Sequence, residues 1–342
     1  MEQYYSKKWF NIFVIFGVIL VIFIVYIYKI LSSNLILDQH NEIIAFNKNA
    51  SARKLVNDLY NKKLIEHPLP VLIYIKIFGL EKQLKAGIYM INPHESCVQL
   101  LKRIIKADVL KLNFKIIAGT TNAQIINTLN TSSYLNNKNL DWHTLQVAYT
   151  TLKIPQDISN FDGLFLADTY QYNADSDTKN LLNQAHKQLE KTLLTAWENR
   201  QNNLPYKSPY ELLTAASIIE KESANFADRY KISSVIVNRL KNNMPLQMDP
   251  TVIYGLGSKY CGKLTHKDLQ QQSPYNTYQN RGLPPTPIAN VASDAILAAS
   301  QPGETHYLYF VAKGDGTHEF SENYNAQKQA IKQYLGNKKY GH

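Results

Sequence analysis

The best-specified helix in the sequence is SPYELLTAASIIEKE, residues 208–222. Ser208 is a favourable N-cap, Pro209 fits the first helical turn, and Glu211 stands where a capping box needs an acid. The run that follows is apolar on almost every side, so it predicts a helix buried in the core of a domain. This helix ends with two acids, Glu220 and Glu222, which are unusual at the end of a buried helix.

The two glutamates lie near the negative end of the helix dipole, which disfavours a charged carboxylate. Burial acts in the same direction and raises the pKa of a carboxyl, as a general acid requires at neutral pH. At about 100° per residue, Lys221 points away from the apolar stripe, and Glu220 and Glu222 flank the stripe on opposite sides. The periodicity therefore does not choose between them, and a pair of solvated acids at a helix end is the alternative.

Two further segments carry polar groups in patterns that suit a binding site. In LQMDPTVIY, residues 246–254, Asp249 before Pro250 is a helix-start signal, so we expect Asp249 to be an N-cap. The segment SPYNTY, residues 273–278, leads into RGLPPTPI, residues 281–288. Its tyrosine rings, amides and hydroxyls suit a sugar, which needs hydrogen bonds in its ring plane and apolar contact on its faces. Taken alone, the segment is equally typical of a proline-stiffened surface loop.

The N-terminus predicts a membrane span. Residues 10–28 are almost entirely apolar, and they would reach about 28 Å as a helix, close to the thickness of the hydrocarbon core. Lys7 and Lys8 precede this run, and Trp9, Tyr26 and Tyr28 stand at its ends, where interfacial aromatics gather. We expect a transmembrane helix at 9–31 with residues 1–8 in the cytoplasm and the remainder outside. The alternative is a cleaved signal peptide.

Short strands and helices occur along the whole chain, which predicts an α+β fold. A small strand–helix–helix–strand unit is expected before about residue 93, from 42–46, 50–61, 71–78 and 87–91. Further elements are expected at 98–105, 110–117, 122–129, 143–152 and 178–200. A strand at 306–313, a return strand and a helix from about 323 complete the pattern. We place a small subdomain at 40–108 and a larger one at 109–340.

The composition limits the partners. The formal net charge of +10 favours an acidic polymer or an anionic lipid surface. The basic residues are scattered singly, so we expect no nucleic acid. Cys97 and Cys261 are too few and too far apart for structural zinc, and we expect two unpaired thiols in preference to a disulfide. We expect His266, His306 and His318 to be surface or structural residues.

Six segments stand in an order and spacing typical of one family: ASIIEKES (216–223), VNRL (237–240), LQMDPTVIYG (246–255), YNTY (275–278), GLPP (282–285) and YLYFVA (307–312). Through them the chain resembles the endolytic murein transglycosylases, also called YceG-like proteins, over about residues 40–335. The family has a membrane anchor and a LysM-like subdomain, and these correspond to the apolar run and to the small unit that follows it.

The resemblance also implies roles for single residues. Glu220, the first acid of Glu-Lys-Glu, corresponds to the catalytic acid/base. The implied cleft residues are Asp168, Gln247, Asp249, Tyr254, Tyr275, Asn276 and Thr277, and no metal or organic cofactor is implied. An earlier family motif, Glu-Gly-x-x-x-Pro-Asp-Thr-Tyr, is altered here to Asp162-Gly163 and Ala167-Asp168, although Asp168-Thr169-Tyr170 is intact.

The implied reaction is non-hydrolytic cleavage of the β-1,4 bond between N-acetylmuramic acid and N-acetylglucosamine, which leaves a 1,6-anhydro end. The implied setting is the cell inner membrane, with a periplasmic catalytic domain, peptidoglycan strands as substrate and peptidoglycan synthases as partners. Two alternatives stay open at this point. One is a peptidoglycan hydrolase that uses Asp249 or Asp162 as a second carboxylate, and the other is a non-catalytic cell-wall-binding protein.

Overall fold

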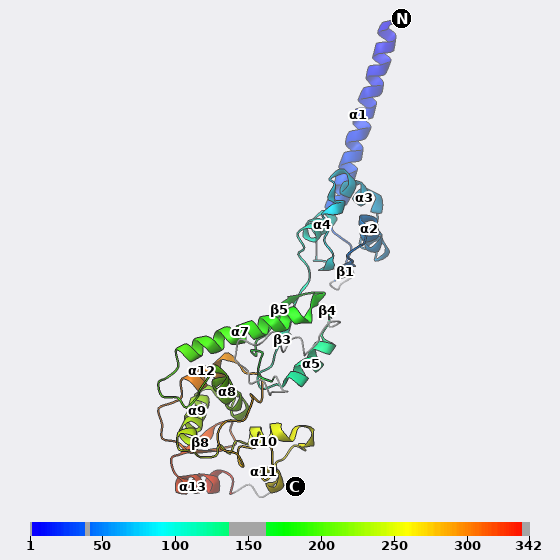
Figure 1. Ribbon diagram of the computed structural model, residues 1–342. Helices are drawn as coiled ribbons and strands as arrows, with labels where there is room; N and C mark the ends of the chain where they lie inside the picture. Colours follow the sequence, from blue (N-terminus) through cyan, green and yellow to red (C-terminus); the bar gives the residue numbers. More distant parts are fainter. Residues whose placement is uncertain (1, 38–41, 137–161, 337–342) are drawn as a thin grey trace. The chain divides into compact units, whose positions relative to one another are not determined.

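The computed structural model describes residues 2–37, 42–136 and 162–336, and the chain divides into two compact units (Figure 1). Unit 1 comprises Met1–Leu112 with Asn173–Asp175, and unit 2 comprises Asn113–Tyr172 with Ser176–His342. Helices and short strands occur in both units, which confirms the predicted α+β class. The helix expected at 143–152 lies outside the described residues.

Unit 1 begins with the long helix α1 (Glu2–Ser32), in which Asn11–Ser32 is long and apolar enough to cross a bilayer. Almost none of this span is buried within the protein, although a signal sequence would meet the same test of length and composition. The last turns differ from the rest, because Leu31 is buried and Ile27 packs against the core of unit 1. The last turns of the predicted span at 9–31 therefore contact the core of unit 1.

The remainder of unit 1 has the predicted strand–helix–helix–strand order. Strand β1 (Ile43–Phe46) pairs antiparallel with β2 (Gly87–Met90), and Ile43 lies opposite Met90. The other elements are α2 (Ala52–Asn61), α3 (Pro68–Ile77), the 3-10 turn η1 (Leu80–Lys82) and α4 (Cys97–Ile105). Ile44, Leu55, Tyr89 and Leu101 are among the residues of its core. The likeness to a LysM fold stays a prediction.

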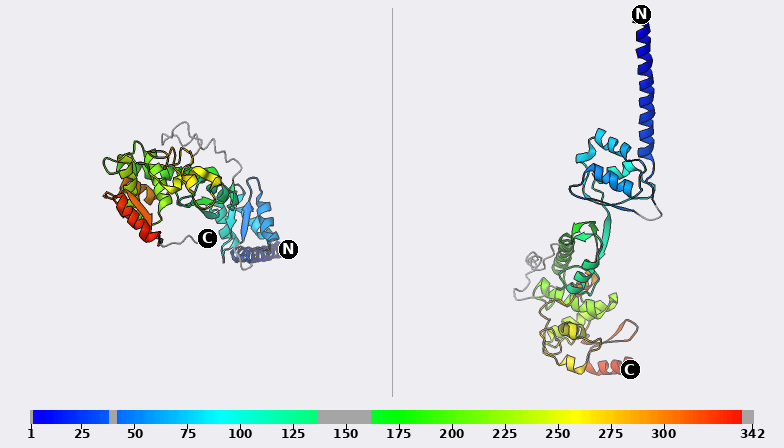
Figure 2. Two further views of the ribbon diagram at one scale, coloured as in Figure 1. Left: turned by 90° about the horizontal axis from the view of Figure 1, so that it is seen from below. Right: turned by 90° about the vertical axis from the view of Figure 1, so that its right-hand side faces the viewer.

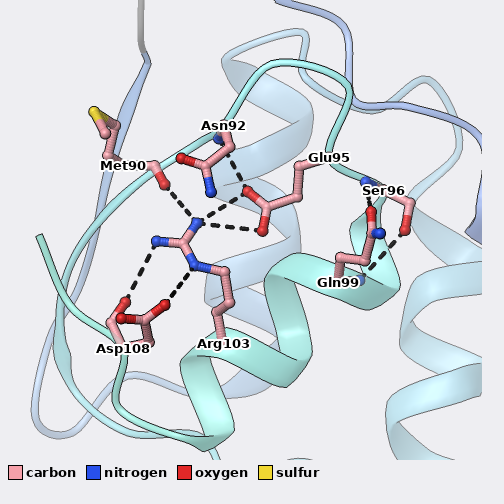
Figure 3. Close-up of polar contacts among 7 residues, drawn as sticks. All are labelled: Met90, Asn92, Glu95, Ser96, Gln99, Arg103 and Asp108. Carbon is pink, nitrogen blue, oxygen red and sulfur yellow. Dashed lines mark hydrogen bonds and ion pairs between the residues drawn. The ribbon is translucent and has the colours of Figure 1, made fainter.

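A partly buried arginine, Arg103, fixes the turn between β2 and α4 (Figure 3). Arg103 Nη1 donates to the carbonyl of Met90 at 2.8 Å and to Glu95 Oε2 at 3.0 Å, and Arg103 Nε donates to Asp108 Oδ2 at 3.0 Å. The Glu95 side chain is only 4% exposed. The cost of burying its charge is offset by this pairing and by a hydrogen bond from the backbone N–H of Asn92. The cluster ties β2 to α4, and so it is structural.

Unit 2 is built around the buried helix α8 (Pro209–Glu222), as its sequence predicts. It packs against α7 (Thr178–Glu198), α9 (Phe226–Lys241) and α12 (Ser293–Ser300). In Figure 1, α8, α9 and α12 lie close together and α7 runs along the border of the unit above them; Figure 2 gives two further views. Residues 212–219 of α8 are all buried, which explains why this stretch has almost no polar face.

The other described strands, which lie wholly or mostly in unit 2, are short and lie outside this helical core. They pair as β3 (Lys111–Lys115) with β5 (Thr169–Asn173), β4 (Leu135–Asn136) with β6 (Ser176–Asp177), and β7 (Tyr309–Ala312) with β8 (His318–Ser321). The remaining elements are α5 (Asn122–Thr131), α10 (Asp249–Leu256), η3 (Gly257–Lys259), α11 (His266–Leu269) and α13 (Tyr324–Tyr334).

Two predicted helix starts differ from the observed ones. Ser208 caps α8 as expected, but Glu211 accepts from the backbone N–H of Lys207 at 2.7 Å, so the predicted capping box is wrong in its second half. The prediction that Asp249 is an N-cap is also wrong, because Met248 is the cap residue and Asp249 is the first residue of α10. The Asp249 side chain therefore does not cap α10 and can bind a partner outside this helix. Cys97 is buried and Cys261 is exposed, and both thiols are free, as expected.

Candidate active site

A cavity of ≈ 250 Å³ lies where α8 ends, beside the turn that leads into α10. It is lined by side chains from five parts of unit 2: Glu222; Arg239; Leu246, Gln247, Met248 and Asp249; Tyr278; Phe310, Val311, Ala312 and His318. Two carboxyls, a guanidinium, an amide and a phenol converge here. The cavity therefore combines groups that can donate, accept and transfer protons.

A larger cavity of ≈ 520 Å³ lies between α7 and α12. Its one carboxylate is Asp294, which is already paired with Arg229 at 3.3 Å. None of the predicted site residues lines it. Its only other ionisable side chain among the lining residues is Lys191, so this larger cavity does not bring an acid and a base together as the smaller one does.

Glu222 is the acid that faces the smaller cavity. It is the last residue of α8, and Ser223 leaves the helix in an extended conformation, so the helix stops at the cavity wall. Among the described residues no hydrogen bond or ion pair involves its carboxyl, unlike that of Glu220. Burial, and secondly the negative charge of Asp249, raises the pKa of Glu222 to about 8. The raised pKa favours the protonated form of Glu222 near neutral pH, which suits a general acid.

Asp249 is held in place by Tyr278. The Tyr278 hydroxyl donates to Asp249 Oδ1 at 2.6 Å, and burial together with this carboxylate raises the pKa of Tyr278 above its ordinary value. Tyr278 thus stays a donor, and it keeps the charge of Asp249 near Glu222. The two carboxyls have different surroundings, which is the usual way in which a paired acid and base divide their roles.

Arg239 forms the buried wall of the cavity. It is 6% exposed, and its Nε donates to the carbonyl of Leu308 at 2.6 Å. Its Nη1 donates to the carbonyls of Pro245 and Leu246 and to Gln247 Oε1, at 3.1, 2.8 and 3.2 Å. The guanidinium therefore connects α9 to the turn before α10 and to the residue before β7. Burial lowers the pKa of Arg239 from its ordinary value, but an arginine remains charged.

Asn276 and Thr277, two predicted cleft residues, are buried and act within the protein. Asn276 Nδ2 donates to the carbonyls of Leu269 and Gln271 at 3.1 and 2.8 Å, and its Oδ1 accepts from the N–H of Tyr278. Thr277 Oγ1 accepts from the N–H of Met248 at 3.0 Å, and the Thr277 carbonyl accepts from the N–H of Gln247 at 3.1 Å. Both residues fix the loops that carry Tyr278, Gln247 and Asp249. Neither lines the cavity.

Tyr254 and Tyr275 belong to a second cluster in unit 2. Their rings meet edge to face at 4.9 Å, and Tyr254 donates to Asp162 Oδ2 at 2.7 Å. Asp162 is buried and accepts from the N–H of Asn122 as well. This cluster connects α10 to the start of α5. Asp162, which stands where the family motif has a longer glutamate, therefore links these two helices. Neither tyrosine lines the cavity.

Glu220 has the opposite surroundings to Glu222. Its side chain is 4% exposed and pairs with Arg229, whose Nη2 donates to Glu220 Oε1 and whose Nη1 lies 3.4 Å from Glu220 Oε2. The backbone N–H of Ala292 donates to Glu220 Oε2 at 3.0 Å. Charge-assisted bonds of this kind stabilise the carboxylate and leave neither oxygen facing the cavity. The two acids thus differ in their surroundings, and the catalytic role that the resemblance implies for Glu220 stays a prediction.

The structure also shows where Asp168 and His318 lie. Asp168 is exposed and its Oδ1 accepts from the N–H of Thr169, away from the cavity lining. His318, expected to be structural, lines the cavity and bonds Asp228 Oδ2 at 3.1 Å through Nδ1. Over the described ranges no group of three or more His, Cys, Asp or Glu side chains is placed to hold a metal ion. Arg239 and Tyr278 also line the cavity, and they lie within the segments VNRL (237–240) and YNTY (275–278).

The model of the YceG-like family matches residues 44–333, which confirms the resemblance inferred from the sequence. An endolytic murein transglycosylase from Bacillus subtilis (strain 168) is 40% identical over 178 residues, 52% of this chain and 49% of that protein. The one from Streptococcus pneumoniae serotype 2 is 29% identical over 183 residues, 52% of this chain and 33% of that protein. The matches thus span about half and a third of the lengths of these relatives.

A solved structure shares the fold. The crystal structure of a YceG-like protein from Listeria monocytogenes has a TM-score of 0.53 and 28% identity, and the alignment covers 85% of this chain and 99% of the other.

Proposed function

The chain belongs to the YceG-like family, and on that premise we propose that it is an endolytic murein transglycosylase in which Glu222 is the general acid. The observation that carries the assignment is the contrast between the two acids at the end of α8. Glu222 lines a cavity and has a pKa raised to about 8, whereas Glu220 is enclosed by Arg229 and Ala292. The names of the Bacillus and pneumococcal relatives support the reaction class.

The proposed reaction cleaves the bond between N-acetylmuramic acid and N-acetylglucosamine in two proton transfers. Glu222 gives its proton to the glycosidic oxygen, the bond from that oxygen to C1 breaks, and an oxocarbenium-like centre develops at C1. The Glu222 carboxylate then takes the proton of the muramyl C6 hydroxyl, and that oxygen bonds to C1. The products are a free hydroxyl on one sugar and a 1,6-anhydro end on the other, so no water is consumed.

Asp249 has a supporting role in this scheme. Its negative charge favours the protonated form of Glu222 before the first step, and it also stabilises a positive centre that develops nearby. The same carboxylate is what a hydrolase would use to activate water, so hydrolysis is the competing reaction.

The setting is part of the proposal. We infer that α1 anchors the protein in the cell inner membrane with its N-terminus in the cytoplasm, because Lys7 and Lys8 precede the apolar span. Both units would then act outside, where peptidoglycan strands and their synthases are found. The LysM-like assignment of residues 40–108 belongs to the same proposal.

The test is mass spectrometry of sacculi digested by the full chain in detergent micelles. We expect anhydro-muramyl ends, and Glu222→Gln should lower the rate by about 10²-fold or more because the proton donor is lost. The matched variant Glu220→Gln can keep a hydrogen bond to Ala292 and should retain more activity per folded molecule. Reducing muramyl ends would identify a hydrolase instead, and full activity of Glu222→Gln would remove the assignment.

A further inference from the structure

The outer face of α3 is apolar although it lies at the surface of unit 1. Val71 and Ile75 are buried in the core of the unit, as the inner face of a surface helix should be. On the other side Leu69 is 68% exposed and Ile77 is 73% exposed. At about 100° per residue Leu69, Ile73 and Ile77 follow one another along this outer side. We call these three residues the outer stripe of α3. A surface helix normally has a polar outer face, so the stripe indicates an interaction surface.

The start of α3 lies beside the last turns of α1 (Figure 1). A cavity of ≈ 440 Å³ between them is lined by Tyr26 and Lys29 of α1 and by His67 and Val71 at the start of α3. Tyrosine and lysine are typical of the ends of membrane spans, where the polar tip reaches the headgroups and the stem stays in the apolar layer. Leu69 stands between His67 and Val71, so it lies near the level at which the apolar span of α1 would leave a bilayer.

The length and charge of α3 also suit a membrane surface. The helix has ten residues, which is too short to cross a bilayer and typical of an interfacial segment. It contains no acid, and its one lysine, Lys76, is exposed beside Ile77 on the side of the stripe. Residues 42–112 carry twelve lysines and arginines against six acids. A helix that combines an apolar face with lysine binds at the headgroup layer, and anionic lipids strengthen this binding.

We propose that the outer stripe of α3 lies in the headgroup layer of the membrane that α1 crosses. Unit 1 would then contact the bilayer twice, through a span and through a surface helix. This inference rests on the membrane setting proposed for α1 and goes beyond it, because an anchor needs α1 alone. A single span leaves the unit free to tilt and to turn about the helix axis, whereas a second contact restricts both motions.

The test is fluorescence quenching of the full chain in vesicles of phosphatidylcholine and phosphatidylglycerol. Cys261→Ser removes the exposed thiol and Cys97 is buried, so Ile77→Cys in this background places one fluorophore on the stripe. Nitroxide lipids labelled near the headgroup should quench it at least about threefold more than a fluorophore on Asn47→Cys, because an inserted face lies within ~10 Å of the headgroup–acyl boundary. Asn47 is exposed and follows β1, which lies further from α1 than α3 does in Figure 1.

A charge placed on the stripe should weaken the contact. Leu69→Glu should lower the quenching of the Ile77 fluorophore by about half or more, because a carboxylate disfavours immersion in the apolar layer. Leu194→Glu is the matched control, since Leu194 is an exposed leucine of α7 in unit 2 and the change of charge is the same. Equal quenching in the two variants would overturn the role of the stripe. Quenching at Ile77 no greater than at Asn47 would overturn the docking itself, whether water or a second copy of the chain covers α3.

A third fluorophore separates this proposal from the one on which it rests. Ile19 lies within the apolar span of α1 and is 58% exposed, so Ile19→Cys reports whether that span is in the bilayer. Lipids labelled deep in the acyl chain should quench it strongly. Quenching at Ile19 without quenching at Ile77 would remove the docking of α3 and leave the anchor. An unquenched Ile19 would remove the membrane setting, and the double contact with it.

Discussion

The folded chain binds a proton at the Glu222 carboxyl more tightly than the unfolded chain does. Its carboxyl has a pKa of about 8 when folded, against an ordinary value of 4.5. Between these pH values the folded state binds the extra proton, so the free energy of unfolding decreases as the pH rises from 4.5 to about 8. Above that range the cost of a buried carboxylate is fully present. An acid kept ready for proton transfer thus reduces the stability of the protein at alkaline pH.

We predict that Glu222→Gln removes this pH dependence. Relative to the unmodified protein, the variant should gain several kcal/mol of unfolding free energy between pH 4.5 and 9, since a pKa unit corresponds to ~1.4 kcal/mol. The measurement is chemical unfolding followed by circular dichroism at pH 4.5, 7 and 9. Glu304→Gln, at an exposed position, is the control for losing one carboxylate. A stability difference that stays constant over this range would contradict the raised pKa.

At the scale of elements, the buried ion pair of Glu220 and Arg229 joins three helices. Glu220 belongs to α8 and Arg229 to α9, while Ala292 is the N-cap of α12 and Asp294 lies in its first turn. Arg229 Nε also donates to the Ser223 carbonyl at 2.9 Å, which fixes the end of α8 next to Glu222. The pair therefore positions the proposed acid without touching the cavity.

Glu220→Ala should destabilise this junction by about 3 kcal/mol, because it leaves a buried guanidinium with only the half-exposed Asp294 as a charge partner. Hydrogen exchange of peptides from α8, α9 and α12 is the measurement, and protection should fall in all three. Glu222→Ala, two residues away, removes no bond made by the described residues and is the matched control. Equal protection in the two variants would show that the ion pair is not what holds the helices together.

The elements were largely predictable from sequence, and the site was predictable only in part. Caps and periodicity located α2, α4, α7 and α8, since those signals lie within four residues of one another. The choice between Glu220 and Glu222 depends on Arg229 and Asp249, which reach α8 through tertiary packing. The same holds for Thr277, whose partners Gln247 and Met248 lie about thirty residues away. Side-chain roles set by such distant partners are not visible in a local pattern.

At the scale of the whole molecule, the charge next to α1 decides on which side of a membrane both units would act. Lys7 and Lys8 precede the apolar span, and Lys29 near its other end reduces the asymmetry. Cytoplasmic flanks are enriched in lysine and arginine, so the two units should be exported. We predict that a phosphatase which is active only outside the cytoplasm, fused after His342, will be active in cells.

A Lys7→Glu/Lys8→Glu variant leaves Lys29 as the nearest basic residue, so it should lower the phosphatase activity of the fusion by at least about tenfold, because the orientation then tends to invert. A Lys48→Glu/Lys54→Glu variant, with the same change of charge in unit 1, is the matched control and should keep its activity. A fluorescent protein that folds only in the cytoplasm, fused at the same place, should give the opposite pattern. If it fluoresces in the unmodified chain, both units are cytosolic, and peptidoglycan would be out of reach of Glu222.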